Sequence, residues 1–188
     1  MEKKIFDDRL SAFFLRLTRR GFWELGINDA AVARYLADVL AEFARADNLY
    51  HVRSRTGKKL DSVTELVMSS GPQGVKDNPP LRERALHKCL SDYSLFMSGI
   101  FRPYVERMRV SRYLREGRRF YWNVSELDLS LYRTGFLLFQ ELSNKFEYYS
   151  GALDYVRKAY FAPKPGKDPF AGFWKQVEGW RKVNVTEN

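Results

Sequence analysis

One carboxylate stands apart from the other charged residues of this sequence. Asp92 is the only charge between Lys88 and Arg102, within a helical stretch whose other side chains are apolar or small. A carboxylate in such surroundings must be paired, hydrogen-bonded or protonated. Two interpretations stay open. Asp92 either lies at the rim of the bundle or pairs with an arginine such as Arg112 or Arg119, or it is the polar anchor of a ligand pocket between helices.

A group of arginines follows this stretch. Seven of them fall within eighteen residues, against two glutamates; they are Arg102, Arg107, Arg109, Arg112, Arg115, Arg118 and Arg119. Guanidinium groups pair with phosphates, and the aromatic residues interleaved with them could stack on nucleic-acid bases. Their directions cover more than half of the helical wheel, so not all can face one partner. The alternative is a solvated helix face whose arginine stems cover apolar surface.

The sequence predicts no metal site and no catalytic residue. His51, His87 and Cys89 are the only imidazoles and thiol, and His87 and Cys89 point to opposite sides of a helix. Glu83 and His87 share a helix face, which fits an ordinary surface pair better than two metal ligands. Nucleophile elbows and phosphate-binding glycine loops are missing, so no cofactor is predicted, and a binding protein is favoured over an enzyme. Acidic pairs such as Glu126 with Asp128 are interpreted as helix caps.

The element that must position Asp92 is a helix over residues 80–101. Pro80 suits a first helical turn, and apolar residues then recur at three- and four-residue steps. Small residues fill its second face, and a helix that is apolar or small all round is normally buried on all sides. The pattern therefore predicts the central helix of a bundle.

Shorter patterns predict the other elements. Helical spacing from Phe6 to Leu17 ends near Gly21, and Asn28 or Asp29 caps a second helix that ends at 47–48. Before the helix at 80–101, the sequence predicts an irregular stretch at 49–59, a short helix after Ser62 and a loop at 71–80. After it, a basic helix follows Pro103, a break is expected at 123–125, and helical spacing extends over 129–160 with a break or kink near Ser150-Gly151. A linker at 162–169 and a helix at 170–180 complete the chain.

Together these patterns predict an all-α fold with little or no sheet. We expect a single-domain bundle of about seven helices over residues 1–161, built around the helix at 80–101. Residues 162–188 are expected to form a linker and a short C-terminal helix that docks on the bundle.

Composition and net charge indicate which partners and which cellular compartment suit the protein. The 188 residues carry a net charge of +9, which suits an acidic partner such as nucleic acid but does not require one. The single cysteine fits a reducing compartment, and neither a signal peptide nor an apolar run of ~18 residues is present. A soluble, cytoplasmic protein without a membrane partner is predicted, and a homo-oligomer is compatible with the sequence.

Four segments resemble a family of uncharacterised bacterial all-α proteins. They are Asp47–Tyr50, Ser91–Phe101, Gly117–Tyr121 and Leu142–Phe146, within a resemblance that covers roughly residues 30 to 160. The resemblance implies no activity, cofactor or catalytic residue. It marks six positions to probe, which are Asp92, Tyr93, Gly99, Arg118, Arg119 and Tyr121.

The function predicted first is binding of an anionic or aromatic small ligand in an inter-helix pocket. The predicted ligand-binding residues are Asp92, Tyr93, Arg112, Arg118, Arg119 and Tyr121. One alternative is a nucleic-acid or polyanion-associated protein that uses the basic helix at 102–119. Another is a helical enzyme without a recognisable catalytic motif.

Overall fold

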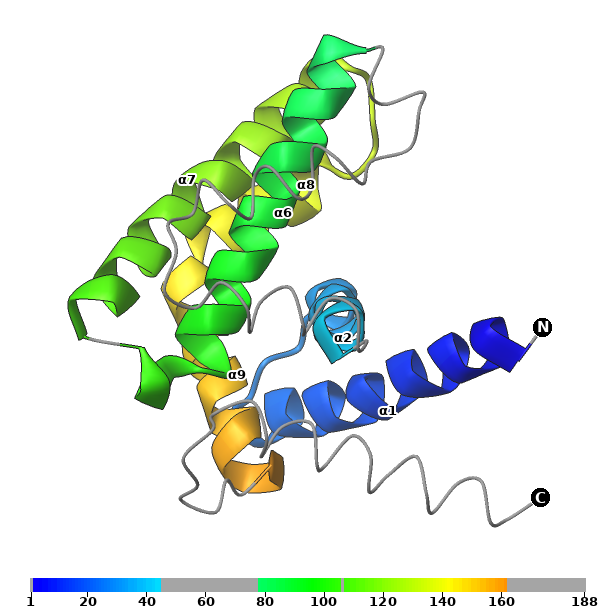
Figure 1. The fold of residues 1–188 in the computed structure, drawn as a ribbon, viewed down its shortest axis with the longest axis vertical. Coiled ribbons are helices and arrows are strands. Elements are labelled where there is room, and N and C mark those ends of the chain that lie inside the picture. Colours follow the sequence, from blue (N-terminus) through cyan, green and yellow to red (C-terminus); the bar gives the residue numbers. More distant parts are fainter. Residues whose placement is uncertain (1, 45–77, 106, 162–188) are drawn as a thin grey trace. The chain divides into compact units, whose positions relative to one another are not determined.

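The computed structural model describes residues 2–44, 78–105 and 107–161. These residues form six α-helices, a 3₁₀ turn and a π-turn and contain no strand, which confirms the all-α class (Figure 1). No helix in this described part is long and apolar enough to cross a membrane. The features predicted at 49–59, 71–77 and 162–188, and the short helix after Ser62, lie outside the described residues.

The chain divides into two compact units, which are residues 1–53 with 152–188 and residues 54–151. In the first unit, α1 (Glu2–Glu24) packs against α2 (Ala30–Ala44), and a π-turn (Arg157–Phe161) follows α9. The Asp29 carboxylate caps α2, because its Oδ1 accepts a hydrogen bond from the backbone N–H of Val32 at 2.9 Å.

The predicted end of α1 near Gly21 is wrong. Gly21 lies inside the helix, where a Cβ atom would come within 2.5 Å of Val156 Cγ2, so this glycine permits close packing. The helix ends instead at Glu24 and is followed by Gly26, whose φ of +73° is left-handed. The N–H of Ile27 then bonds to the carbonyl of Phe22 at 2.8 Å, which is the Schellman pattern.

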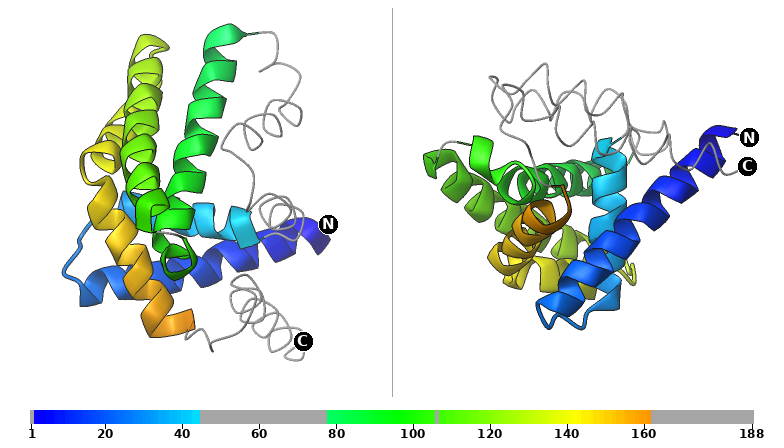
Figure 2. Two further views of the ribbon diagram at one scale, coloured as in Figure 1. Left: turned by 60° about the vertical axis from the view of Figure 1, so that its left-hand side comes forward. Right: turned by 90° about the horizontal axis from the view of Figure 1, so that it is seen from below.

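The second unit is built on two long neighbouring helices. The central helix α6 (Pro79–Gly99) lies beside α7 (Arg107–Ser130), with a 3₁₀ turn (Arg102–Tyr104) between them in the chain (Figures 1 and 2). Then α8 (Phe136–Asn144) packs on α7, and α9 (Phe146–Val156) follows.

The central helix has the predicted burial. Asn78 caps it through a 3.2 Å bond from the N–H of Leu81, two prolines occupy its first turn, and every residue from 90 to 99 is buried. Its small face permits close contact, because a Cβ on Gly117 would lie 2.9 Å from the Cβ of Ser94. Ser98 meets α9, where the hydroxyls of Ser98 and Ser150 are 2.9 Å apart.

Two predicted helix breaks are wrong. Helix α7 continues through Asn123–Ser125, and α9 continues through Ser150–Gly151. Val124, Ser125 and Ser150 are buried, and packing outweighs the weak local preference of serine for helix ends. The actual breaks are the turn between α7 and α8, where Tyr132 has a φ of +55°, and the joint at Lys145 between α8 and α9.

Candidate functional site

The carboxylate of Asp92 is buried and bonded to two side chains. Its Oδ1 accepts a 2.6 Å hydrogen bond from the hydroxyl of Tyr121 on α7, and its Oδ2 accepts a 2.6 Å bond from Lys88 Nζ one turn back on α6. Asp92 is 4 % exposed and Tyr121 is fully buried. The side chains thus join α6 to α7 through a charge-assisted hydrogen bond inside the second unit.

Neither Arg112 nor Arg119, the two arginines named as expected partners, pairs with Asp92. Arg112 instead pairs with Glu116 on its own helix, with 2.9 Å between Nε and Oε1. The Arg119 guanidinium lies 5.1 Å above the ring of Phe120. Lysine four residues before Asp92 on the same helix supplies the cation, because such neighbours meet on one helix face.

The six predicted ligand-binding residues separate into a buried and an exposed group. Asp92, Tyr93 and Tyr121 are buried, whereas Arg112, Arg118 and Arg119 are exposed on α7. The ring of Tyr93 packs against Tyr113 at a centroid distance of 5.8 Å. Burial and the Tyr113 hydroxyl raise the pKa of the Tyr93 phenol well above its ordinary value, so this phenol is neutral. The predicted inter-helix ligand remains a prediction.

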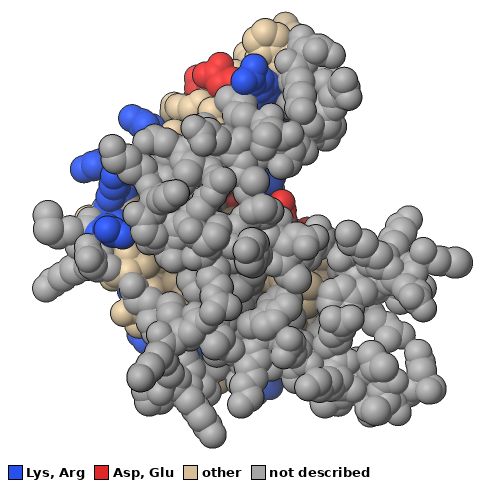
Figure 3. Space-filling view, viewed as in Figure 1, with Lys and Arg blue, Asp and Glu red and all other residues tan. Residues whose placement is uncertain are grey.

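The exposed arginines of α7 lie along one side of the helix. At about 100° per residue, Arg112, Arg115, Arg118 and Arg119 fall within an arc of roughly 120°. We call these four residues the α7 basic stripe. All four are exposed, and Arg115 and Arg118 form no ion pair with any residue that the structure describes. In Figure 3, several lysine and arginine side chains are visible at the upper left, where Figure 1 shows α7.

A tryptophan that the predicted site did not include lies at the end of this stripe. Trp122 is 41 % exposed and is one helical turn beyond Arg118 and Arg119. It makes no ring contact or hydrogen bond with the described part of the chain. By the helical period, Arg115 and Trp122 lie on the same side of the helix. This spacing was the sequence signal that could have identified Trp122.

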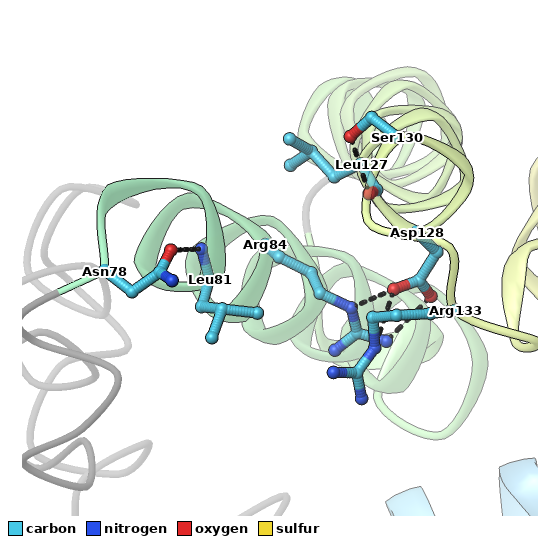
Figure 4. A network of polar contacts seen from close by, with 7 residues as sticks. All are labelled: Asn78, Leu81, Arg84, Leu127, Asp128, Ser130 and Arg133. Atoms are coloured by element: carbon cyan, nitrogen blue, oxygen red, sulfur yellow. Dashed lines mark hydrogen bonds and ion pairs between the residues drawn. The ribbon is translucent and has the colours of Figure 1, made fainter.

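A second buried carboxylate was also interpreted incorrectly as a helix cap. Asp128 lies near the end of α7, is completely buried, and accepts hydrogen bonds from both Nε and Nη2 of Arg84 on α6, the latter at 2.8 Å (Figure 4). Arg133 Nε approaches Asp128 Oδ1 at 3.1 Å. This fork-shaped pair holds α6, α7 and the following turn together. Arg84 and Asp128 are 44 positions apart in the sequence, so no local sequence signal predicted the pair.

The Glu83–His87 pair forms as a surface contact, with 3.5 Å between Glu83 Oε1 and His87 Nε2. The other ring nitrogen of His87 lies 3.2 Å from Asn123 Nδ2. Burial lowers the pKa of His87 below its ordinary value, against the opposing effect of Glu83. Within residues 2–44, 78–105 and 107–161, no three histidine, cysteine or acidic side chains gather in a group that could hold a metal ion.

Comparison with known proteins adds no relative: family models, curated proteins and solved structures give no match to this chain.

Proposed function

We propose that this protein binds nucleic acid through the α7 basic stripe. The observation that carries the proposal is the exposure of all four arginines on one side of one helix. Guanidinium groups there can reach phosphate oxygens without first breaking buried contacts, and they pair with such oxygens through two parallel hydrogen bonds.

The length of the stripe favours a polymer over a small anion. Arg112 and Arg119 are seven positions apart, which is about 10 Å along the helix axis. A nucleic-acid strand carries a phosphate on every nucleotide, so a stripe of this length can meet more than one of them. The outer surface of a helix does not enclose a ligand, whereas small-molecule sites bury most of their ligand.

The charge distribution also favours nucleic-acid binding at the α7 basic stripe. The net charge of +9 attracts a polyanion at long range. Within the stripe, only Arg112 is paired with a carboxylate in the described part of the chain, that of Glu116. Asp92, by contrast, already accepts two hydrogen bonds, so a ligand between α6 and α7 would have to displace Lys88 or Tyr121. The stripe is therefore the more accessible site.

The test compares two variants that lose the same charge. R115Q/R118Q/R119Q removes three arginines of the stripe, whereas R34Q/R82Q/K145Q removes three exposed cations on other parts of the chain. Anisotropy of a labelled 40-nucleotide (dT) strand at 100 mM salt measures the dissociation constant. We expect the stripe variant to bind at least about tenfold more weakly than the control variant, because it loses phosphate contacts. The salt dependence of its binding should be lower for the same reason. Equal weakening in both variants, or no binding by the parent at low salt, would refute the proposal.

A further inference from the structure

An eight-residue pattern occurs twice in this chain, once in each compact unit. Residues 16–23 read RLTRRGFW in α1, and residues 115–122 read REGRRFYW in α7. Both have arginine at the first, fourth and fifth positions, a phenylalanine or tyrosine at the seventh, and tryptophan at the eighth.

The two segments also have the same pattern of burial, position by position. In each, the three arginines and the tryptophan are exposed, while the third, sixth and seventh residues are buried. The seventh residues, Phe22 and Tyr121, are almost completely buried and anchor their helices in the two cores. Successive helical residues point about 100° apart, so the tryptophan that follows the buried aromatic residue points away from the core.

The exposed side chains of each segment share one helix face. The three arginines and the tryptophan fall within an arc of about 100° in both helices. Arg16 and Arg19 form no ion pair within the described part of the chain, as is true of Arg115 and Arg118. Arg20 is paired with Glu24 at 3.2 Å, yet its side chain is still 68 % exposed. We call Arg16, Arg19, Arg20 and Trp23 the α1 surface.

The exposed tryptophans are not explained by packing. Trp23 is 76 % exposed, and neither Trp23 nor Trp122 makes a ring contact or hydrogen bond with the residues described. A flat indole beside two arginines, three and four residues away, is suited to a nucleic-acid base whose neighbouring phosphates reach the guanidinium groups. Bases inside a duplex are already stacked on each other, so only a single strand can offer an open base face.

We propose that the α1 surface is a second nucleic-acid site of the same kind as the one on α7, and that both take single-stranded nucleic acid by stacking a base on tryptophan. This inference rests on the proposed function of the α7 basic stripe and extends it to a separate helix.

The experiment counts sites with short strands. Titration of the full chain with (dT)10, followed by anisotropy and calorimetry, is expected to give two strands per parent chain. The variants R16Q/R19Q/W23L and R115Q/R118Q/W122L should each bind one strand, and the variant with all six changes should bind none. An abasic strand with the same number of phosphates should bind the parent at least about fivefold more weakly, the lower end expected for loss of base stacking.

The possible failures are distinguishable. If the parent binds a single (dT)10 and only the α7 variant loses it, the second site is refuted and the proposed function stands. If neither variant binds fewer strands than the parent, both proposals fail. Equal affinity for abasic and intact strands would refute base stacking, and binding to phosphatidylserine vesicles without binding to (dT)10 would refute nucleic acid as the ligand. W23F and W122F, which keep an aromatic ring, should retain two sites. The triple variants should keep the parent's circular dichroism melting curve, which excludes misfolding as the cause of a lost site.

Discussion

The hydroxyl of Tyr121 on α7 lies 2.6 Å from the carboxylate of Asp92 on α6, and both side chains are buried. A phenol in this position satisfies one carboxylate oxygen, while Lys88 satisfies the other. The bond therefore links the two long helices of the second unit at a point where an unpaired carboxylate would be strongly destabilising.

Removing that phenol should weaken the fold. We expect Y121F to lower the free energy of unfolding by about 1.5–3 kcal/mol, because it removes a hydrogen bond to a charged acceptor. Urea denaturation followed by circular dichroism measures the change. The matched control is Y148F, since Tyr148 is half exposed, and its effect should stay within about 0.5 kcal/mol. Equal stability of Y121F and the parent would contradict a stabilising role for this bond.

Replacing a helical glycine with alanine should change the stability of the protein in opposite directions at Gly117 and at Gly151. A Cβ atom on Gly117 would lie 2.2 Å from Phe146 Cζ, whereas one on Gly151 would meet nothing within 4 Å. G117A should therefore destabilise the protein by about 1–3 kcal/mol through overpacking. G151A should stabilise it by about 0.5–1 kcal/mol, the gain in helix propensity. Thermal melts of both variants test this, and a destabilised G151A would contradict the open space at that position.

The buried pair between Arg84 and Asp128 should be costly to break from one side. R84M leaves the carboxylate of Asp128 buried with only the half-exposed Arg133 beside it, and we expect a loss of about 3–5 kcal/mol. R133M should cost less than about 1 kcal/mol, because Arg133 is solvent-screened. The double variant R84M/D128L should be more stable than R84M alone, since it no longer buries an unpaired charge. A double variant less stable than R84M would contradict this account.

The lowered pKa of His87 should make stability depend on pH. The unfolded imidazole keeps its ordinary pKa of 6.5, while the folded one titrates lower, so below 6.5 the unfolded state binds more protons. The contribution of His87 to the free energy of unfolding should be fully present above pH 6.5 and should be lost as the pH decreases toward the pKa of the folded state. H87Q should remove this part of the dependence. Denaturant midpoints from pH 7.5 to 5.5 test it, and an identical slope for parent and H87Q would contradict the assignment.

Periodicity in the sequence was sufficient to determine the fold class and the central helix. Apolar and small residues on both faces of residues 80–101 predict burial without knowledge of any partner, and the structure confirms it from Leu90 to Gly99. Asp29 as a cap was also readable, because capping depends on residues three positions apart. The boundaries near Gly21, Asn123 and Ser150 were not, since long-range packing decides whether a glycine or serine ends a helix.

The partners of buried charges depended on the tertiary structure. The sequence singled out Asp92 as the carboxylate that needs a partner, but it left both Lys88 and Tyr121 unidentified, and it treated Asp128 as a cap. A hydrogen bond between α6 and α7 depends on the rotation and register of both helices, which no local pattern encodes. Exposure is decided in the same way: the arginines and tryptophans at 16–23 and 115–122 are visible in the sequence, but only the packing of the helices turns both sets outward.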